Sequence, residues 1–79
     1  MSKIINSSIL KIISKETIKQ YEALRQSRVT NMFDYYNVIY HAKRINFKEL
    51  TNLSLDNYQI LLLNFSKLMK HYNIKQPTN

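Results

Sequence analysis

Residues 58–72 read Tyr-Gln-Ile-Leu-Leu-Leu-Asn-Phe-Ser-Lys-Leu-Met-Lys-His-Tyr, and this stretch decides the fold of the chain. Its apolar side chains recur at spacings of three and four, the period of an amphipathic α-helix. Ser54, followed by Asp56, provides an N-cap for this helix, and Pro77 follows in a polar tail. The apolar stripe consists of Tyr58, Leu61, Leu62, Phe65, Leu68, Met69 and Tyr72.

Two further apolar residues, Ile60 and Leu63, do not fit this stripe. With about 100° per residue, they fall near 200° and 140° from Tyr58 and point away from it. One interpretation is that the N-terminal segment Ile4–Ile13 packs across them and makes the last helix central. The other is that both residues belong to a two-fold dimer interface or to a partner-binding patch.

The N-terminal third of the chain predicts a second amphipathic helix between Ile5 and Leu24. Ser7 or Ser8 can cap its start, and Ser14 can equally cap a second start, so a break near Ser14 is possible. On the polar side, lysines recur every four residues, at Lys11, Lys15 and Lys19.

A linker at residues 27–29 separates this helix from a third one, expected from about Met32 to Arg44. Thr30 or Asn31 serves as its expected N-cap, with Asp34 as the acidic partner of a capping box. Asn46 replaces the usual glycine at a left-handed helix stop. Residues 47–52 allow one or two helical turns. The expected apolar face comprises Met32, Tyr35 or Tyr36, Ile39 and Ala42.

These elements predict an all-α fold, a small compact bundle of three principal helices plus a short connecting helical turn. The 79 residues suffice for one domain, expected over residues 1–75, with 1–14 as an N-terminal extension or helix start and 76–79 as a polar tail. The longest apolar run, Ile60–Leu63, is far shorter than the roughly 18 residues of a membrane span, so no transmembrane segment is expected.

The composition excludes several classes of site. The chain has no Cys, which rules out disulfides and thiolate chemistry, and no Gly, which phosphate-binding loops require. His41 and His71 lack the spacing of metal ligands, and the acidic residues fit helix starts and lysine pairs. We therefore expect no catalytic residues, no metal and no cofactor, and a protein that is not an enzyme.

The charge is strongly basic, with 12 Lys and Arg against 5 Asp and Glu and a net charge of +7. The lysine series is either a solvated face or a surface for nucleic acid. Tyr21, Tyr58 and Tyr72 lie on apolar stripes and are expected in the core. The other three tyrosines cannot all face inward from one helix, and they are candidates for exposed stacking groups: Tyr35, Tyr36 and Tyr40.

From about Lys15 to Leu50, the sequence resembles a small family of uncharacterised domains encoded mainly by phages and prophages of Firmicutes. The resemblance is carried by Leu24-Arg25, the string Thr30-Asn31-Met32-Phe33-Asp34, Val38, Ala42 and Phe47-x-Glu49-Leu50. The family usually has glycine at the positions of Arg28 and Asn46, and an aliphatic residue at that of His41. Within the motif, Met32 and Phe33 are expected to act as core anchors beside a helix cap.

The resemblance implies a short helical phage accessory protein in the cytoplasm of a bacterial host. Its expected function is that of a non-enzymatic binding module that modulates or inhibits a host or defence protein complex by occupying a surface of it. The alternative is a small basic DNA- or RNA-binding regulator, and a homodimer is possible. The candidate partner-binding residues are Ile60, Leu63, Lys11, Lys15, Lys19, Tyr35 and Tyr40.

Overall fold

The computed structural model describes residues 5–74, which form five helices and no strand. Three helices are long: α2 (Lys15–Ser27), α3 (Tyr35–Arg44) and α5 (Leu55–His71). Two are short: α1 (Ser7–Ile12) and α4 (Lys48–Thr51). The predicted all-α bundle of three principal helices is confirmed, with the predicted turn at residues 47–52 present as α4. The 76–79 tail lies outside the described residues.

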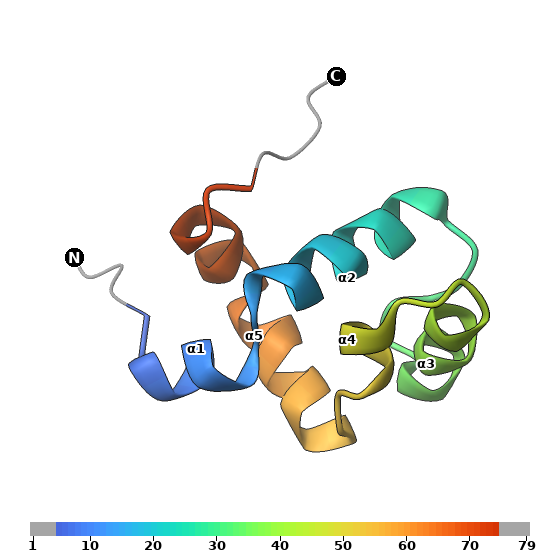
Figure 1. Ribbon diagram of the computed structural model, residues 1–79, viewed down its shortest axis with the longest axis horizontal. Helices are drawn as coiled ribbons and strands as arrows, with labels where there is room; N and C mark the ends of the chain where they lie inside the picture. Colours follow the sequence, from blue (N-terminus) through green and yellow to red (C-terminus); the bar gives the residue numbers. More distant parts are fainter. Residues whose placement is uncertain (1–4, 75–79) are drawn as a thin grey trace.

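The helices are arranged around α2, which packs against α3, α4 and α5. Figure 1 shows α3 and α4 toward one end of the molecule, and α1 with the C-terminal part of α5 toward the other. Within residues 5–74, no helix is long and apolar enough to cross a membrane, as expected.

Polar side chains start the helices by accepting hydrogen bonds from backbone N–H groups that have no partner in the first turn. Ser14 caps α2 and Ser54 caps α5, as predicted. The cap of α1 is Asn6 rather than Ser7 or Ser8. The break at Ser14 separates α1 from α2, so the N-terminal segment is two helices and not one.

The start of α3 also differs from the prediction. The helix begins at Tyr35, because Asp34 itself is the N-cap and accepts a hydrogen bond from the Asn37 N–H at 3.3 Å. Neither Thr30 nor Asn31 caps it. Val38, which the expected apolar face omitted, is fully buried, and of the two neighbouring tyrosines Tyr35 is the one that packs on the core.

Two of the helix connections place a residue with a side chain in the left-handed region. Arg28, after α2, has φ 58°, and Asn46, after α3, has φ 69°. The left-handed stop at Asn46 is confirmed. Positive φ brings Cβ close to the carbonyl oxygen of the same residue, a cost that glycine avoids and asparagine partly offsets. The chain therefore makes these connections without any glycine.

The core is a single cluster that draws on every helix except α1, whose residues Ile9 and Leu10 pack on it from one side. Tyr21 and Tyr58 are buried and Tyr72 packs on the cluster, as predicted. The fully buried members with the largest side chains are Tyr58, Ile13, Ile18, Leu50, Leu61, Leu68 and Val38.

Hydrogen bonds from buried tyrosine hydroxyls to backbone carbonyls fix the connecting segments. Tyr58 on α5 donates to the Met32 carbonyl, and Tyr35 on α3 donates to the Leu53 carbonyl at 2.6 Å. Burial raises the pKa of Tyr58 far above that of a solvated tyrosine because the charged form would be desolvated. The Tyr58 hydroxyl therefore keeps its proton, and with it this hydrogen bond, well into the alkaline range.

Candidate binding surfaces

An exposed apolar surface forms where the loop before α3 meets α5. Phe33 is 81% exposed and Leu63 is 84% exposed, the highest fractions among the large apolar side chains in residues 5–74. Together with Gln59 and Leu62, they line one shallow and almost wholly apolar hollow. We call these four residues the Phe33–Leu63 surface.

The local backbone explains why Phe33 points outward. The Asn31 side chain accepts a hydrogen bond from the Phe33 N–H at 2.9 Å, which closes a tight turn. The Tyr58 hydroxyl holds the Met32 carbonyl against α5, and the Met32 side chain packs on the core. With Met32 turned inward, its neighbour Phe33 is presented to solvent beside Leu63.

The prediction that Phe33 anchors the core is therefore wrong, although Met32 does pack on it. Thr30 is half-buried, and its buried hydroxyl oxygen has no hydrogen-bond partner within residues 5–74. The string Thr30–Asp34 is thus a structured turn with one inward anchor, one outward aromatic ring and a helix cap at its end.

The two residues that did not fit the stripe of the last helix have different environments. Leu63 is exposed, so the interpretation that the N-terminal segment covers it is wrong. Ile60 is half-buried and is not among the residues that line the hollow with Leu63. The exposed partner of Leu63 is Phe33, from another element. In the sequence, the outward position of Leu63 was indicated by its angle from the apolar stripe of the last helix, whereas nothing indicated its pairing with Phe33.

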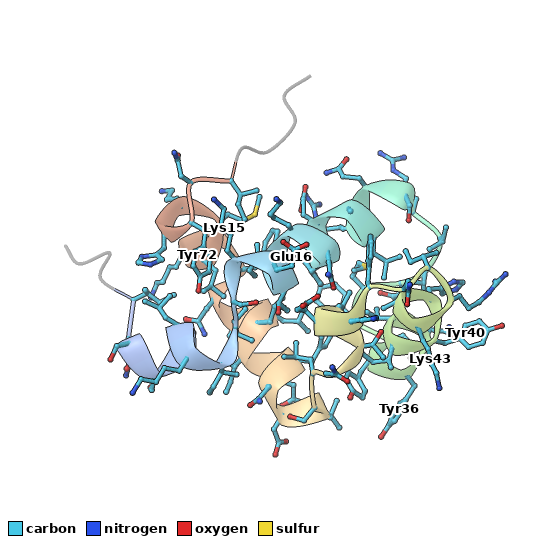
Figure 2. All side chains as sticks on the ribbon, in the orientation of Figure 1. Lys15, Glu16, Tyr36, Tyr40, Lys43 and Tyr72 are labelled. Atoms are coloured by element: carbon cyan, nitrogen blue, oxygen red, sulfur yellow. The ribbon has the colours of Figure 1, made fainter. Side chains whose placement is uncertain are left out.

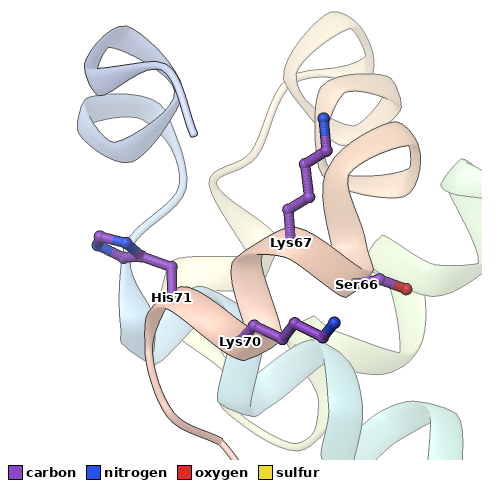
Figure 3. A pocket seen from close by; sticks show the side chains of 4 residues that line it. All are labelled: Ser66, Lys67, Lys70 and His71. Carbon is purple, nitrogen blue, oxygen red and sulfur yellow. The ribbon is translucent and has the colours of Figure 1, made fainter. Parts of the chain in front are cut away.

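Further along α5, the same helix carries a basic surface. Ser66, Lys67, Lys70 and His71 line an open hollow, and Figure 3 shows their side chains along the last turns of the helix. Lys67 follows Leu63 by four residues, so the two lie on one side of the helix. An apolar surface and a basic surface are thus continuous along α5.

The three lysines predicted as one series are all exposed but do not form one helix face. Lys11 belongs to α1, whereas Lys15 and Lys19 belong to α2, and the break at Ser14 lies between them. Tyr35 is also removed from the candidates for a binding surface, since its ring packs on the core and its hydroxyl is bonded to Leu53.

The outer face of α3 carries two exposed aromatic side chains. Tyr36 is 73% exposed and Tyr40 is 57% exposed. Figure 2 shows both rings and Lys43 projecting from α3 at one end of the molecule. The guanidinium of Arg44 lies over the Tyr40 ring, 5.8 Å from its centroid. Tyr40 therefore remains a candidate partner-binding residue, and the exposure of Tyr36 makes it a second one.

Several carboxylates have structural partners. Glu22 accepts two hydrogen bonds from Arg25 at 2.9 Å, which raises the pKa of that guanidinium, and a third from Gln26. Glu49 accepts a hydrogen bond from Gln20 at 2.7 Å. No group of three or more metal-ligating side chains occurs among the described residues. These contacts stabilise helices and their connections.

No family model, curated protein or solved structure matches this chain. The surfaces described above are therefore the basis on which a function can be proposed. They are of two kinds: an apolar pair that continues into a basic stretch on α5, and an aromatic and basic face on α3.

Proposed function

We propose that this protein is a non-enzymatic binding module that modulates a host or defence protein complex by occupying a surface of it in the cytoplasm of a bacterial host. The observation that carries the proposal is the exposed pair Phe33 and Leu63. They come from separate elements and line a common apolar hollow. The resemblance of the Thr30–Asp34 region to small phage domains supports the proposal that the protein acts in a bacterial host.

Burial of Phe33 and Leu63 in a complex would contribute to the free energy of binding. Burial of one large apolar side chain is worth about 1.5–3 kcal/mol, and interface energy is concentrated in a few such side chains near the centre of a patch. Phe33 and Leu63 together would thus supply a substantial part of the free energy of binding. Leu62 and Gln59 surround them and would exclude water from the contact.

The charge of the chain indicates what kind of protein surface would fit. Lys67 and Lys70 continue from Leu63 along α5, and the net charge of the whole chain is +7. An acidic protein face with a small apolar recess complements both properties and would speed association. A second copy of the chain fits less well, because two molecules of charge +7 repel each other.

The test is affinity capture from host lysate with purified wild-type protein, with and without nuclease. It is run in parallel with the double variant Phe33→Ser/Leu63→Ser and with the control Ile45→Ser. Ile45 is an exposed apolar residue that lines a different hollow, so this control removes a comparable side chain elsewhere. Far-ultraviolet circular dichroism of each variant establishes that it is folded.

We expect a specific protein to be captured by the wild type and the Ile45→Ser variant after nuclease treatment. The double variant should lose at least about 100-fold in affinity for the isolated partner. Capture that disappears with nuclease points to a nucleic-acid bridge and contradicts the proposal. Equal capture by the folded double variant contradicts it as well.

A further inference from the structure

The outer face of α3 combines two exposed tyrosines with basic residues. Tyr36 and Tyr40 are four residues apart and therefore lie on the same side of the helix. Tyr36 is oriented by an edge-to-face contact with Tyr35, at 5.1 Å between ring centroids. Tyr35 is held in turn by its hydrogen bond to Leu53. The Tyr36 ring is thus exposed and also held in place.

Basic residues continue this face toward the C-terminal end of α3. Lys43 and Arg44 occupy its last turn, and Arg44 stacks over Tyr40. Beyond the helix, Lys43 and Lys48 line a polar hollow with Asn46, Thr51 and Asn52. The aromatic pair is therefore followed, toward the C-terminal end of α3, by three cations: Lys43, Arg44 and Lys48.

No acidic residue counters this charge within the helix, since residues 35–44 contain neither Asp nor Glu. Asp34, at the N-terminal end, is engaged as the helix cap. Glu49 on α4 accepts a hydrogen bond from Gln20. Within α3 and the hollow beyond it, the charged side chains are the cations Lys43, Arg44 and Lys48.

Exposed aromatic rings beside cations are what a single strand of nucleic acid requires, because every base has a face on which a ring can stack and every phosphate attracts a cation. Four residues along a helix span about 6 Å. This exceeds the roughly 3.4 Å between stacked bases in a duplex, so the spacing suits bases that are already separated. An acidic polypeptide would use the cations but not the ring faces.

We propose that the outer face of α3 binds single-stranded nucleic acid, with two bases stacked on Tyr36 and Tyr40 and phosphates on Lys43, Arg44 and Lys48. This site shares no residue with the Phe33–Leu63 surface and does not depend on the protein-binding function. Both DNA and RNA present bases that can stack and phosphates that can bind cations at this site.

The test is fluorescence anisotropy of a labelled oligonucleotide of about 15 nucleotides, a length chosen to cover typical site sizes. Oligo-thymidine and oligo-uridine separate DNA from RNA, a duplex tests strandedness, and unlabelled polyglutamate tests competition by charge alone. Each titration is repeated between about 50 and 200 mM salt. Binding of either single strand, tighter than binding of the duplex and resistant to polyglutamate, is the expected result.

Variants then assign the roles of the residues. Tyr36→Ala and Tyr40→Ala should each weaken binding about tenfold, whereas Tyr36→Phe and Tyr40→Phe should restore it because the ring is kept. Lys43→Gln/Lys48→Gln should lower the slope of log K against log salt by about 0.7 for each lysine. The matched control Lys11→Gln/Lys15→Gln removes the same charge at the other end of the molecule and should leave the slope unchanged.

Three results would overturn the proposal. The first is no binding of either single strand at the lowest salt. The second is unchanged affinity in the folded Tyr36→Ala and Tyr40→Ala variants. The third is attraction by net charge alone, which would show as an equal effect of the two lysine pairs or as equal binding of duplex and single strand.

Discussion

The hydroxyl of Tyr72 donates a hydrogen bond to the backbone carbonyl of Ile13 at 2.7 Å, across 59 residues of sequence. The acceptor lies at the break between α1 and α2, where the carbonyl leaves the helical pattern. The bond therefore joins the end of α5 to the point at which the N-terminal segment changes direction.

Replacement of Tyr72 by Phe should lower the free energy of unfolding by about 1 kcal/mol, because the Ile13 carbonyl loses its partner. The loss corresponds to a fall in melting temperature of about 4–8 °C for a domain of this size. Amide hydrogen exchange should also speed up in α1. Tyr36→Phe, at an exposed ring, is the control, and an equal loss of stability there would argue against this role of Tyr72.

Gln20 is a buried polar residue that connects α2 to α4. Its amide oxygen accepts from the Leu50 N–H at 2.9 Å, and its amide nitrogen donates to Glu49. Gln20→Ala should cost about 1–3 kcal/mol, since the buried Leu50 N–H is left without a partner. Urea denaturation measures the change. Gln59→Ala, at an exposed glutamine on α5, is the control and should change stability by less than about 0.5 kcal/mol.

Arg28 has a left-handed backbone, and glycine should be more stable there. Arg28→Gly removes the Cβ contact and is expected to raise the free energy of unfolding by about 0.5–1 kcal/mol. Arg28→Ala keeps the Cβ and should give no such gain, which separates backbone strain from loss of charge. Asn46→Gly should gain less, because asparagine tolerates this conformation. A gain in Arg28→Ala equal to that in Arg28→Gly would refute the explanation.

Stability should fall at alkaline pH because burial raises the pKa values of Tyr21, Tyr58 and Tyr72 above their ordinary value of 10.0. Below this pH, the folded and unfolded states both keep these protons, and stability does not change. Above it, the unfolded chain releases protons that the folded chain retains, so the unfolded state is favoured. The melting temperature should therefore decline from about pH 10 upward. Tyr58→Phe should decline less steeply, despite a lower stability at neutral pH.

The sequence was most informative where one physical signal dominated. The stripe from Tyr58 to Tyr72 predicted α5, and Ser14 and Ser54 predicted two helix starts that the structure confirms. Asn46, predicted to end a helix in the left-handed conformation, has positive φ. These features depend on spacing or on local backbone geometry, which neighbouring residues determine.

The motif before α3 was harder to interpret, since several of its residues compete for the same role. Thr30, Asn31 and Asp34 can each cap a helix, and the choice of Asp34 moved the start of α3 by three residues. The pairing of Phe33 with Leu63 could not be predicted at all. It depends on how the loop docks on α5 through the Tyr58 hydroxyl, a contact between residues 26 apart in sequence.

The inward-facing aromatic rings form a continuous series of contacts through the core. Tyr35 lies 5.5 Å from Tyr58, Tyr58 lies 5.9 Å from Tyr21, and Tyr21 lies 5.0 Å from Phe65, measured between ring centroids. With six Tyr and no Trp in the chain, the near-ultraviolet dichroism arises chiefly from tyrosine, and these packed rings dominate it. The protein thus carries its own optical reporter of side-chain packing, which would disappear in a molten globule even while the far-ultraviolet signal of the helices persists.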